Sequence, residues 1–277
     1  MIENGALSEQ LTELRGQYYQ RGLYSGQTMV DAIERGGVEF ADNTIVFVAD
    51  GRSTETTVGT LFREATAFAA GLQARGIGTG DRVAVQLPNS PECYIAHLAV
   101  LLSGATLLPI IPIYGLKEVD FILRQSGARA LILPARLGAT DYRDRVAGLL
   151  EIGSLEHLIM VGDGAHSACV SWEEVAQGGA YIRPSADADE VCLLLYTSGT
   201  TSDPKGVLHS HNSLLAELSN SPIQGVGDGD YVSLVAFPAG HIAGVLNICR
   251  PAVGGGSSVF MDQWRPDLAA DLIERYK

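Results

Sequence analysis

Hydroxyl-bearing residues, a glycine and a lysine gather in residues 196–207, whose sequence is YTSGTTSDPKGV. Consecutive hydroxyls and backbone N–H groups in a tight loop can wrap a polyphosphate. Glycine lets the backbone approach the anion closely, and charge-assisted bonds from lysine to phosphate are about twice as strong as neutral hydrogen bonds. The segment therefore predicts a phosphate-binding loop, formed by Thr197, Ser198, Gly199, Thr200, Thr201 and Lys205.

The order of residues in this loop differs from that of a Walker A loop, in which a Gly-Lys-Ser/Thr string enters a helix. Lys205 lies between Pro204 and Gly206, and it is followed by Val207 and Leu208, which favour a strand. A surface turn without chemistry is the alternative, and it would fit the composition alone equally well. Because the ordered string is much more specific than the composition, we favour the phosphate-binding interpretation.

A histidine near the end of the chain is a second candidate. His241 follows the aromatic–proline pair Phe237 and Pro238 and precedes the small residues Ala243 and Gly244. This composition suits the wall of a substrate pocket. A histidine that only caps a helix is the alternative.

Two further histidines could ligate a metal, since His209 and His211 alternate along a strand-like stretch. Metal sites built on histidine usually add cysteine or carboxylate ligands, and the sequence places no such cluster beside them. We therefore predict no metal site here and interpret His211 as the start of a helix.

The charge balance argues against one class of partner. The 277 residues carry a net charge of −13, with 46% hydrophobic and 18% charged residues. This composition is typical of a globular protein. Nonspecific affinity for nucleic acid comes mainly from Lys and Arg that neutralise phosphates, so we expect no nucleic-acid partner. A local site for ATP remains compatible with the acidity.

Cysteine usage and hydropathy indicate a cytoplasmic protein without a transmembrane segment. The four cysteines form no Cys-x-x-Cys pair, and the amino terminus lacks the pattern of a secretory signal, so reduced thiols are expected. The most apolar stretch, residues 98–113, is interrupted by Ser103, Gly104, Thr106, Pro109 and Pro112. A membrane-spanning helix needs about 20 predominantly apolar residues, so we predict a buried helix followed by a strand.

Helical and strand patterns alternate along most of the chain. Apolar spacing, caps and turn residues predict helices at 28–37, 58–72, 117–125 and 142–150, one that starts at Ser90-Pro91, and others near 211, 241 and 266. Short apolar or β-branched runs predict strands at 44–49, 53–57, 83–87, 106–110, 130–133, 158–161, 191–196, 232–236 and 258–261. Such alternation implies right-handed crossovers and mostly parallel sheets flanked by helices. The predicted fold class is therefore α/β.

The region 163–189 is looser and predicts a boundary between two α/β subdomains, residues 1–175 and residues 176–277. Only a few strands of the second subdomain appear before the final helix, which ends the chain without a closing element. We therefore expect the second subdomain to be truncated. An apolar edge left uncovered by truncation would favour self-association through that subdomain.

Several ordered motifs carry a family resemblance that covers nearly the whole chain. Besides YTSGTTSDPKGV at 196–207, they are RGIGTGDRV at 75–83, PNS at 88–90, LSGAT at 102–106, FPAGHIAG at 237–244 and LIERYK at 272–277. Together they resemble the adenylate-forming superfamily of acyl- and aryl-CoA synthetases, firefly luciferase and the adenylation domains of nonribosomal peptide synthetases. One residue departs from the pattern: Ser202 stands where many members have a second glycine. A serine is strained there if the position needs positive φ.

The resemblance implies an AMP-forming acid–thiol ligase that uses ATP, Mg²⁺ and coenzyme A to activate a carboxylic acid. By resemblance, the loop residues named above hold the β- and γ-phosphates of ATP, and His241 borders the acyl pocket. The adenine, ribose and Mg²⁺ contacts and the catalytic lysine of the small carboxy-terminal domain are expected beyond Lys277. We therefore assign no catalytic residue to this chain and expect it to be inactive alone.

Three functions remain open from the sequence. The first is an acyl-CoA ligase, most simply one of fatty acid metabolism. The second is a ligase that loads the thiol of a carrier protein. The third is a nucleotide-binding module without chemistry of its own. The sequence does not identify the acid.

Overall fold

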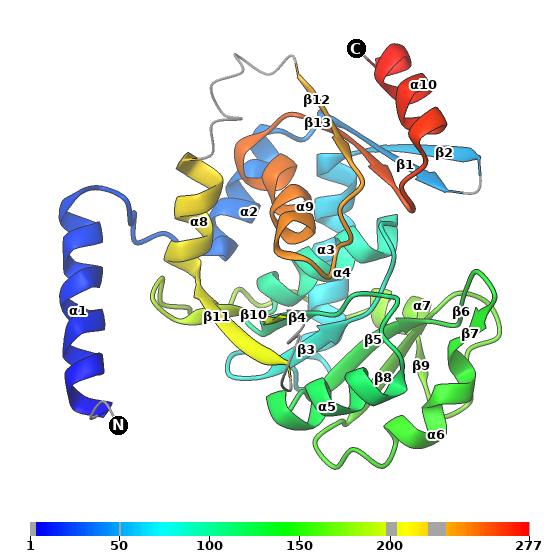
Figure 1. Cartoon of the computed structure of the whole chain (residues 1–277), viewed down its shortest axis with the longest axis horizontal. Coiled ribbons are helices and arrows are strands. Elements are labelled where there is room, and N and C mark those ends of the chain that lie inside the picture. The colour runs from blue at the N-terminus through cyan, green and yellow to red at the C-terminus, as the bar shows by residue number, and fades with distance from the viewer. Residues whose placement is uncertain (1–3, 50, 198–203, 221–230, 277) are drawn as a thin grey trace.

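The computed structural model describes residues 4–49, 51–197, 204–220 and 231–276. Two sheets organise it (Figure 1), one of seven strands in the order β11-β10-β4-β3-β5-β8-β9 and one of four strands in the order β12-β13-β1-β2; β6 and β7 form a separate pair. The strands are β1 (Thr44–Ala49), β2 (Arg52–Thr57), β3 (Arg82–Val85), β4 (Thr106–Pro109), β5 (Ala130–Pro134), β6 (Arg136–Leu137), β7 (Thr140–Asp141), β8 (His157–Val161), β9 (Val170–Ser171), β10 (Val191–Thr197), β11 (Lys205–Ser210), β12 (Val232–Val235) and β13 (Ser257–Met261).

Both sheets are mostly parallel, which confirms the predicted fold class. In the seven-stranded sheet β11 alone runs antiparallel to its neighbour, and in the four-stranded sheet only β2 does. The helices are α1 (Asn4–Gln20), α2 (Met29–Glu39), α3 (Val58–Gln73), α4 (Pro91–Leu102), α5 (Leu116–Ser126), α6 (Val146–Leu149), α7 (Trp172–Ala176), α8 (His211–Asn220), α9 (Ile242–Gly254) and α10 (Pro266–Tyr276).

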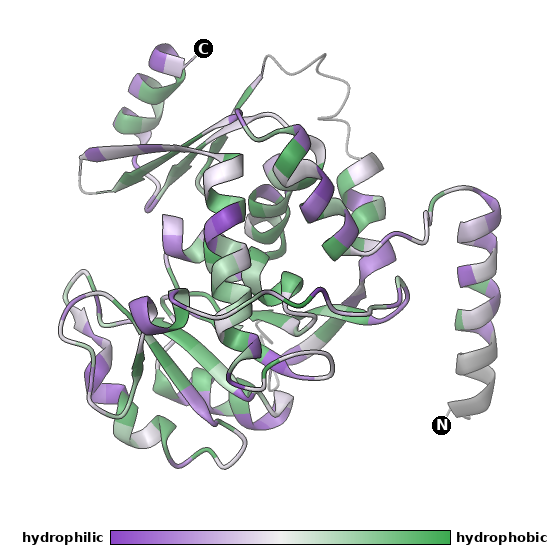
Figure 2. Ribbon diagram, turned by 180° about the vertical axis from the view of Figure 1, so that it is seen from behind, coloured by the Kyte–Doolittle hydropathy of each residue, from purple (hydrophilic) through white to green (hydrophobic). Residues whose placement is uncertain are grey.

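Local sequence signals explain where the central helices begin. Thr28 caps α2 in a complete capping box, since its hydroxyl accepts the Asp31 N–H and the Asp31 carboxylate accepts the Thr28 N–H. Ser90 caps α4, with Pro91 in its first turn. Ten of the twelve residues of α4 are buried, so this helix forms the centre of the molecule. Figure 2 shows the hydrophobic colouring gathered on the central helices and strands.

Two helical regions differ from the sequence-based expectation. The single helix expected at 142–150 is a 3₁₀ turn, Tyr142–Arg145, followed by the one-turn helix α6. Helix α1 is not predicted by the apolar pattern, and its residues Leu11 and Leu14 are exposed. It stands beside the body of the molecule (Figure 1) and is tied to it by an ion pair between Arg15 and Asp189.

The two sheets draw on both sides of the predicted boundary at residue 175. Strands β10 and β11 extend the sheet that holds β3, β4, β5 and β8, while β12 and β13 extend the sheet that holds β1 and β2. The division into subdomains 1–175 and 176–277 therefore stays a prediction. Among the described residues, none of the helices combines the length and the apolar content that crossing a membrane requires. All four cysteines are free thiols.

Candidate functional site

A cavity of about 340 Å³ opens at the carboxyl ends of β4 and β10. Open α/β sheets characteristically bind ligands at this end of their parallel strands. Its wall is mainly apolar and aromatic, with two histidines and one threonine. The lining residues are Ile111, Tyr114, Leu195, Tyr196, Thr197, Val207, His209, Gly240, His241 and Ile242.

The predicted phosphate-binding loop is anchored beside this cavity. Thr197 ends β10 and lines the cavity, and Lys205 begins β11 as its cross-strand partner. The Thr197 hydroxyl donates to the Lys205 carbonyl at 3.4 Å, and Lys205 is exposed. Residues 198–203, with Ser198, Gly199, Thr200 and Thr201, lie outside the described residues. Lys205 leads into a strand and not into a helix, which confirms the distinction from a Walker A loop.

His241 also lines the cavity, at the amino end of α9. It is the N-cap residue of that helix, and its Nδ1 accepts the Ala243 N–H at 3.2 Å. Its ring stacks on Phe237, with centroids 6.3 Å apart. His241 therefore both caps a helix and lines the cavity, so the two interpretations of the sequence are compatible.

Hydrogen bonds from the buried Asn89 side chain hold the turn that precedes His241. Asn89 donates to the carbonyls of Phe237 (3.0 Å) and Met261 (2.9 Å), and its Oδ1 accepts the Ala239 N–H at 3.1 Å. A Cβ on Gly240 would lie 2.4 Å from the Ile111 nitrogen, so only glycine lets this turn approach the end of β4. These contacts hold the cavity wall in one position.

The electrostatics of the cavity suit an uncharged or anionic ligand. Burial lowers the pKa of His209 below its ordinary value, so its ring is neutral at pH 7. Burial also raises the pKa of Tyr196, which keeps the phenol protonated. No carboxylate belongs to the described lining residues. Mg²⁺ is held by oxygen ligands, most often carboxylates, so these described residues do not fit a magnesium site.

The structure separates the two histidines that alternate in the sequence. His209 lines the cavity, whereas His211 is buried and its Nδ1 accepts the Met29 N–H at 3.0 Å. His211 is the first residue of α8, as predicted. Sequence reasoning did not assign Ile111, Tyr114 or His209 to the site. The only available signal was their position next to predicted strands of one sheet.

The fold and this site define an α/β protein with a ligand cavity beside a phosphate-loop motif, and comparison with known families identifies the class. Residues 34–277 match the family described as AMP-binding enzyme. Because the match covers most of the chain, the protein belongs to the AMP-binding enzyme family, as its motifs indicated.

The relatives within this family carry different names. The medium-chain fatty-acid–CoA ligase of Escherichia coli (strain K12) is 27% identical over 268 residues, covering 95% of this chain and 47% of that protein. The salicyl-AMP ligase/salicyl-S-ArCP synthetase of Mycobacterium tuberculosis is 30% identical, covering 94% and 47%. Among solved structures, apo MbtA of Mycobacterium smegmatis matches with a TM-score of 0.82 and 27% identity, covering 94% and 49%. The chain spans about half the length of the curated relatives it matches.

Proposed function

We propose that this chain supplies the phosphate loop and one wall of the acyl pocket in an ATP-dependent ligase that activates a carboxylic acid. In the first step a carboxylate oxygen attacks the α-phosphorus of ATP, the bond to the β-phosphate breaks, and pyrophosphate leaves. In the second step a thiol attacks the carbonyl carbon of the acyl-adenylate, and AMP leaves. The free thiols of the four cysteines support a cytoplasmic setting for this chemistry.

The observation that carries the proposal is the apolar cavity beside the loop anchored by Thr197 and Lys205. An acid seated in the cavity would present its carboxylate toward the loop, where hydroxyls, backbone N–H groups and Lys205 would hold the departing phosphates. The gain comes from positioning and from stabilising charge that develops in the transition state. In this proposal His241 and Tyr114, which both line the cavity, shape the pocket for the acid.

The acceptor thiol divides the proposal into two candidates. Coenzyme A is the first, and the fatty-acid–CoA ligase of Escherichia coli supports it. A carrier-protein thiol is the second, and the salicyl-AMP ligase/salicyl-S-ArCP synthetase supports it. We favour coenzyme A because further relatives, such as a long-chain-fatty-acid–CoA ligase of Salmonella typhimurium, are named for it.

The test is ATP–pyrophosphate exchange with a panel of aliphatic and aryl acids, run on the 277-residue chain and on the complete product of its gene. We expect exchange by the complete product and none by this chain alone, because groups that act as a unit in catalysis are strongly non-additive. Exchange by this chain at the rate of the complete product would refute the proposed division of roles.

The same assay tests the loop. In an exchange-competent protein, Lys205→Ala should lower exchange about 10²- to 10³-fold, the typical cost of one preorganised charge-stabilising contact. Lys117→Ala is the matched control, since Lys117 lies on α5, outside the residues that line the cavity. ATP binding without exchange for any acid would favour the nucleotide-binding module.

A further inference from the structure

A second cavity, of about 260 Å³, lies between α2, α8 and α9 and shares no lining residue with the candidate site. Two arginines line it, Arg35 from α2 and Arg250 from α9, together with Ser25 and Gln27. The other lining residues are Leu215, Leu218, Ser219, Val253 and Gly254. Polar donors and apolar side chains therefore share the lining of this cavity.

Arg250 is the unusual member of this set. Arg250 is only 8% exposed. Among the described residues, its buried Nε and Nη1 have no hydrogen-bond partner, and none of the ion pairs includes Arg250. A buried guanidinium without a partner is strongly unfavourable. An oxyanion bound in the cavity would accept hydrogen bonds from these donors and offset their charge.

The fold holds the two arginines near one another. A Cβ on Gly36 would lie 2.1 Å from the Ala252 carbonyl oxygen, so α2 and α9 touch backbone to backbone beside Arg35 and Arg250. Arg35 donates through its Nη1 to the side-chain Oε1 of Gln27 at 3.0 Å, and the other donors of its guanidinium have no partner within the described residues. The close contact between α2 and α9 therefore brings Arg35 and Arg250 to the same cavity.

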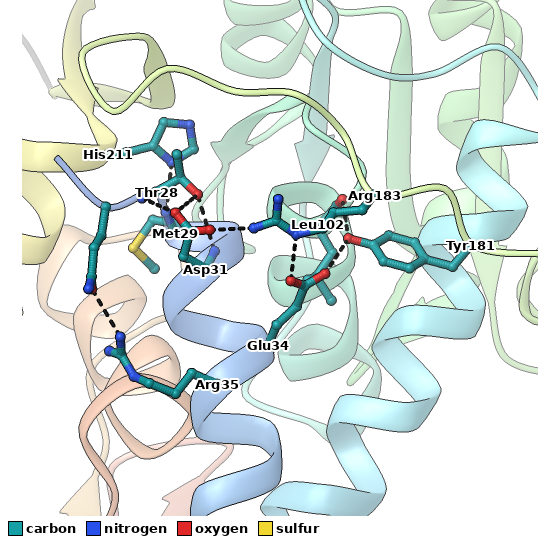
Figure 3. Close-up of polar contacts among 10 residues, drawn as sticks. Thr28, Met29, Asp31, Glu34, Arg35, Leu102, Tyr181, Arg183 and His211 are labelled. Carbon is teal, nitrogen blue, oxygen red and sulfur yellow. Dashed lines mark hydrogen bonds and ion pairs between the residues drawn. The ribbon is translucent and has the colours of Figure 1, made fainter.

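The nearest carboxylates on α2 do not neutralise this pair. Asp31 and Glu34 both bind Arg183, and Tyr181 donates to Glu34. Figure 3 shows these two carboxylates turned toward Arg183, while Arg35 points away from them. No Asp or Glu is among the described residues that line the cavity. A positive site therefore persists in a chain whose net charge is −13.

We propose that this cavity binds a phosphate-type oxyanion, either free inorganic phosphate or the phosphate end of a small phosphomonoester. Guanidinium groups match the geometry of phosphate and bind it through paired, charge-assisted hydrogen bonds. Arg250 and Arg35 supply the charge, and Ser25 and Gln27 supply further polar contacts. The cavity volume of about 260 Å³ is far larger than the volume of about 30 Å³ that one water occupies in the liquid. It is smaller than a typical pocket for a drug-sized ligand, so a small anion suits it.

The experiment is isothermal titration of the chain with inorganic phosphate, against sodium chloride at matched ionic strength. Arg35→Gln and Arg250→Met should each weaken phosphate binding about tenfold or more, the usual effect of losing one charge-assisted hydrogen bond. Arg63→Gln, at an exposed arginine of α3, is the matched control and should bind as the wild type does. Titration with a small phosphomonoester that has no adenine, such as glycerol phosphate, in place of phosphate distinguishes the two sources of the oxyanion.

The Lys205→Ala variant separates this site from the proposed ATP loop. Phosphate binding that survives Lys205→Ala and is lost in Arg35→Gln supports the cavity whether or not the proposed function holds. The Arg250→Met variant adds a second readout: it should raise the melting temperature in chloride, because it removes an unpaired buried charge. Absence of binding by the wild type, or binding lost in Lys205→Ala and kept in Arg35→Gln, would overturn the proposal. If Arg250→Met does not fold, Arg35→Gln decides.

Discussion

The buried His97 should make this protein sensitive to mild acid. His97 lies on α4, 1% exposed, directly beneath the turn that lines the candidate site. Its Nδ1 donates to the Cys93 carbonyl at 2.8 Å, and its Nε2 lies 3.3 Å from the Ala239 carbonyl oxygen. A neutral imidazole donates from one nitrogen only, and the shorter contact identifies Nδ1 as the donor. Burial lowers the pKa of His97 from 6.5 to about 4.

The direction and the size of the effect follow from this pKa. The unfolded chain takes up a proton on His97 near pH 6.5 and the folded protein only near pH 4, so acid favours the unfolded state. Stability is complete above pH 6.5 and is lost as the pH falls toward 4. At about 1.4 kcal/mol per pH unit, the loss is about 2 kcal/mol at pH 5 and approaches about 3 kcal/mol at pH 4.

Urea unfolding at a series of pH values between 7.5 and 4 measures this loss directly, at about half-unit intervals. His97→Gln should remove the corresponding slope, because its side chain keeps polar contacts but takes up no proton. Tyr94→Phe is the matched control on the same buried helix, since the Tyr94 hydroxyl has no hydrogen-bond partner and does not titrate in acid. A His97→Gln variant that keeps the wild-type slope would refute the reasoning.

Three other perturbations test separate parts of the structure. Gly240→Ala should lower the free energy of unfolding by about 1–3 kcal/mol, measured by urea unfolding, because its methyl group meets the backbone of Ile110 and Ile111, just after β4. Gly153→Ala, whose methyl group meets no atom within 4 Å, should change little. Thr28→Ala should cost about 1 kcal/mol by the same measurement, through loss of the α2 cap. Ile273→Glu should reduce self-association in analytical ultracentrifugation, because Ile273 is 61% exposed on α10, a helix that packs against the edge strand β12.

Local signals made much of the fold predictable. The capping box at Thr28, the Ser90-Pro91 start of α4 and the apolar strand runs each depend on neighbours a few residues away. Helix α1 has no stripe of buried apolar residues at helical spacing. Its Leu11 and Leu14 are exposed, so the apolar pattern did not reveal the helix. The 3₁₀ turn at 142–145 replaces a helix because Asp141 accepts the Arg143 N–H and starts a tighter turn.

The candidate site was predictable only where its residues form a contiguous string. Residues 196–207 carry their chemistry in sequence order, so the loop could be recognised without a structure. The cavity combines Ile111 with His209 and Gly240, which are far apart in the chain and meet through sheet pairing and a glycine contact. The cavity of Arg35 and Arg250 likewise depends on the backbone contact at Gly36, which no motif encodes.

The two cavities differ in how the core supports them, and this difference bears on their roles. The wall around His241 is fixed by Asn89 and Gly240 through buried hydrogen bonds and backbone packing. A preorganised site loses little binding energy in ordering its own groups. Adenylation of an acid needs such a site, because the carboxylate must be placed accurately against the phosphate. The second cavity is fixed in its backbone but has an unpaired Arg250. Its energy falls when an anion arrives, so occupancy there should stabilise the contact of α2 with α9 and thereby the folded protein.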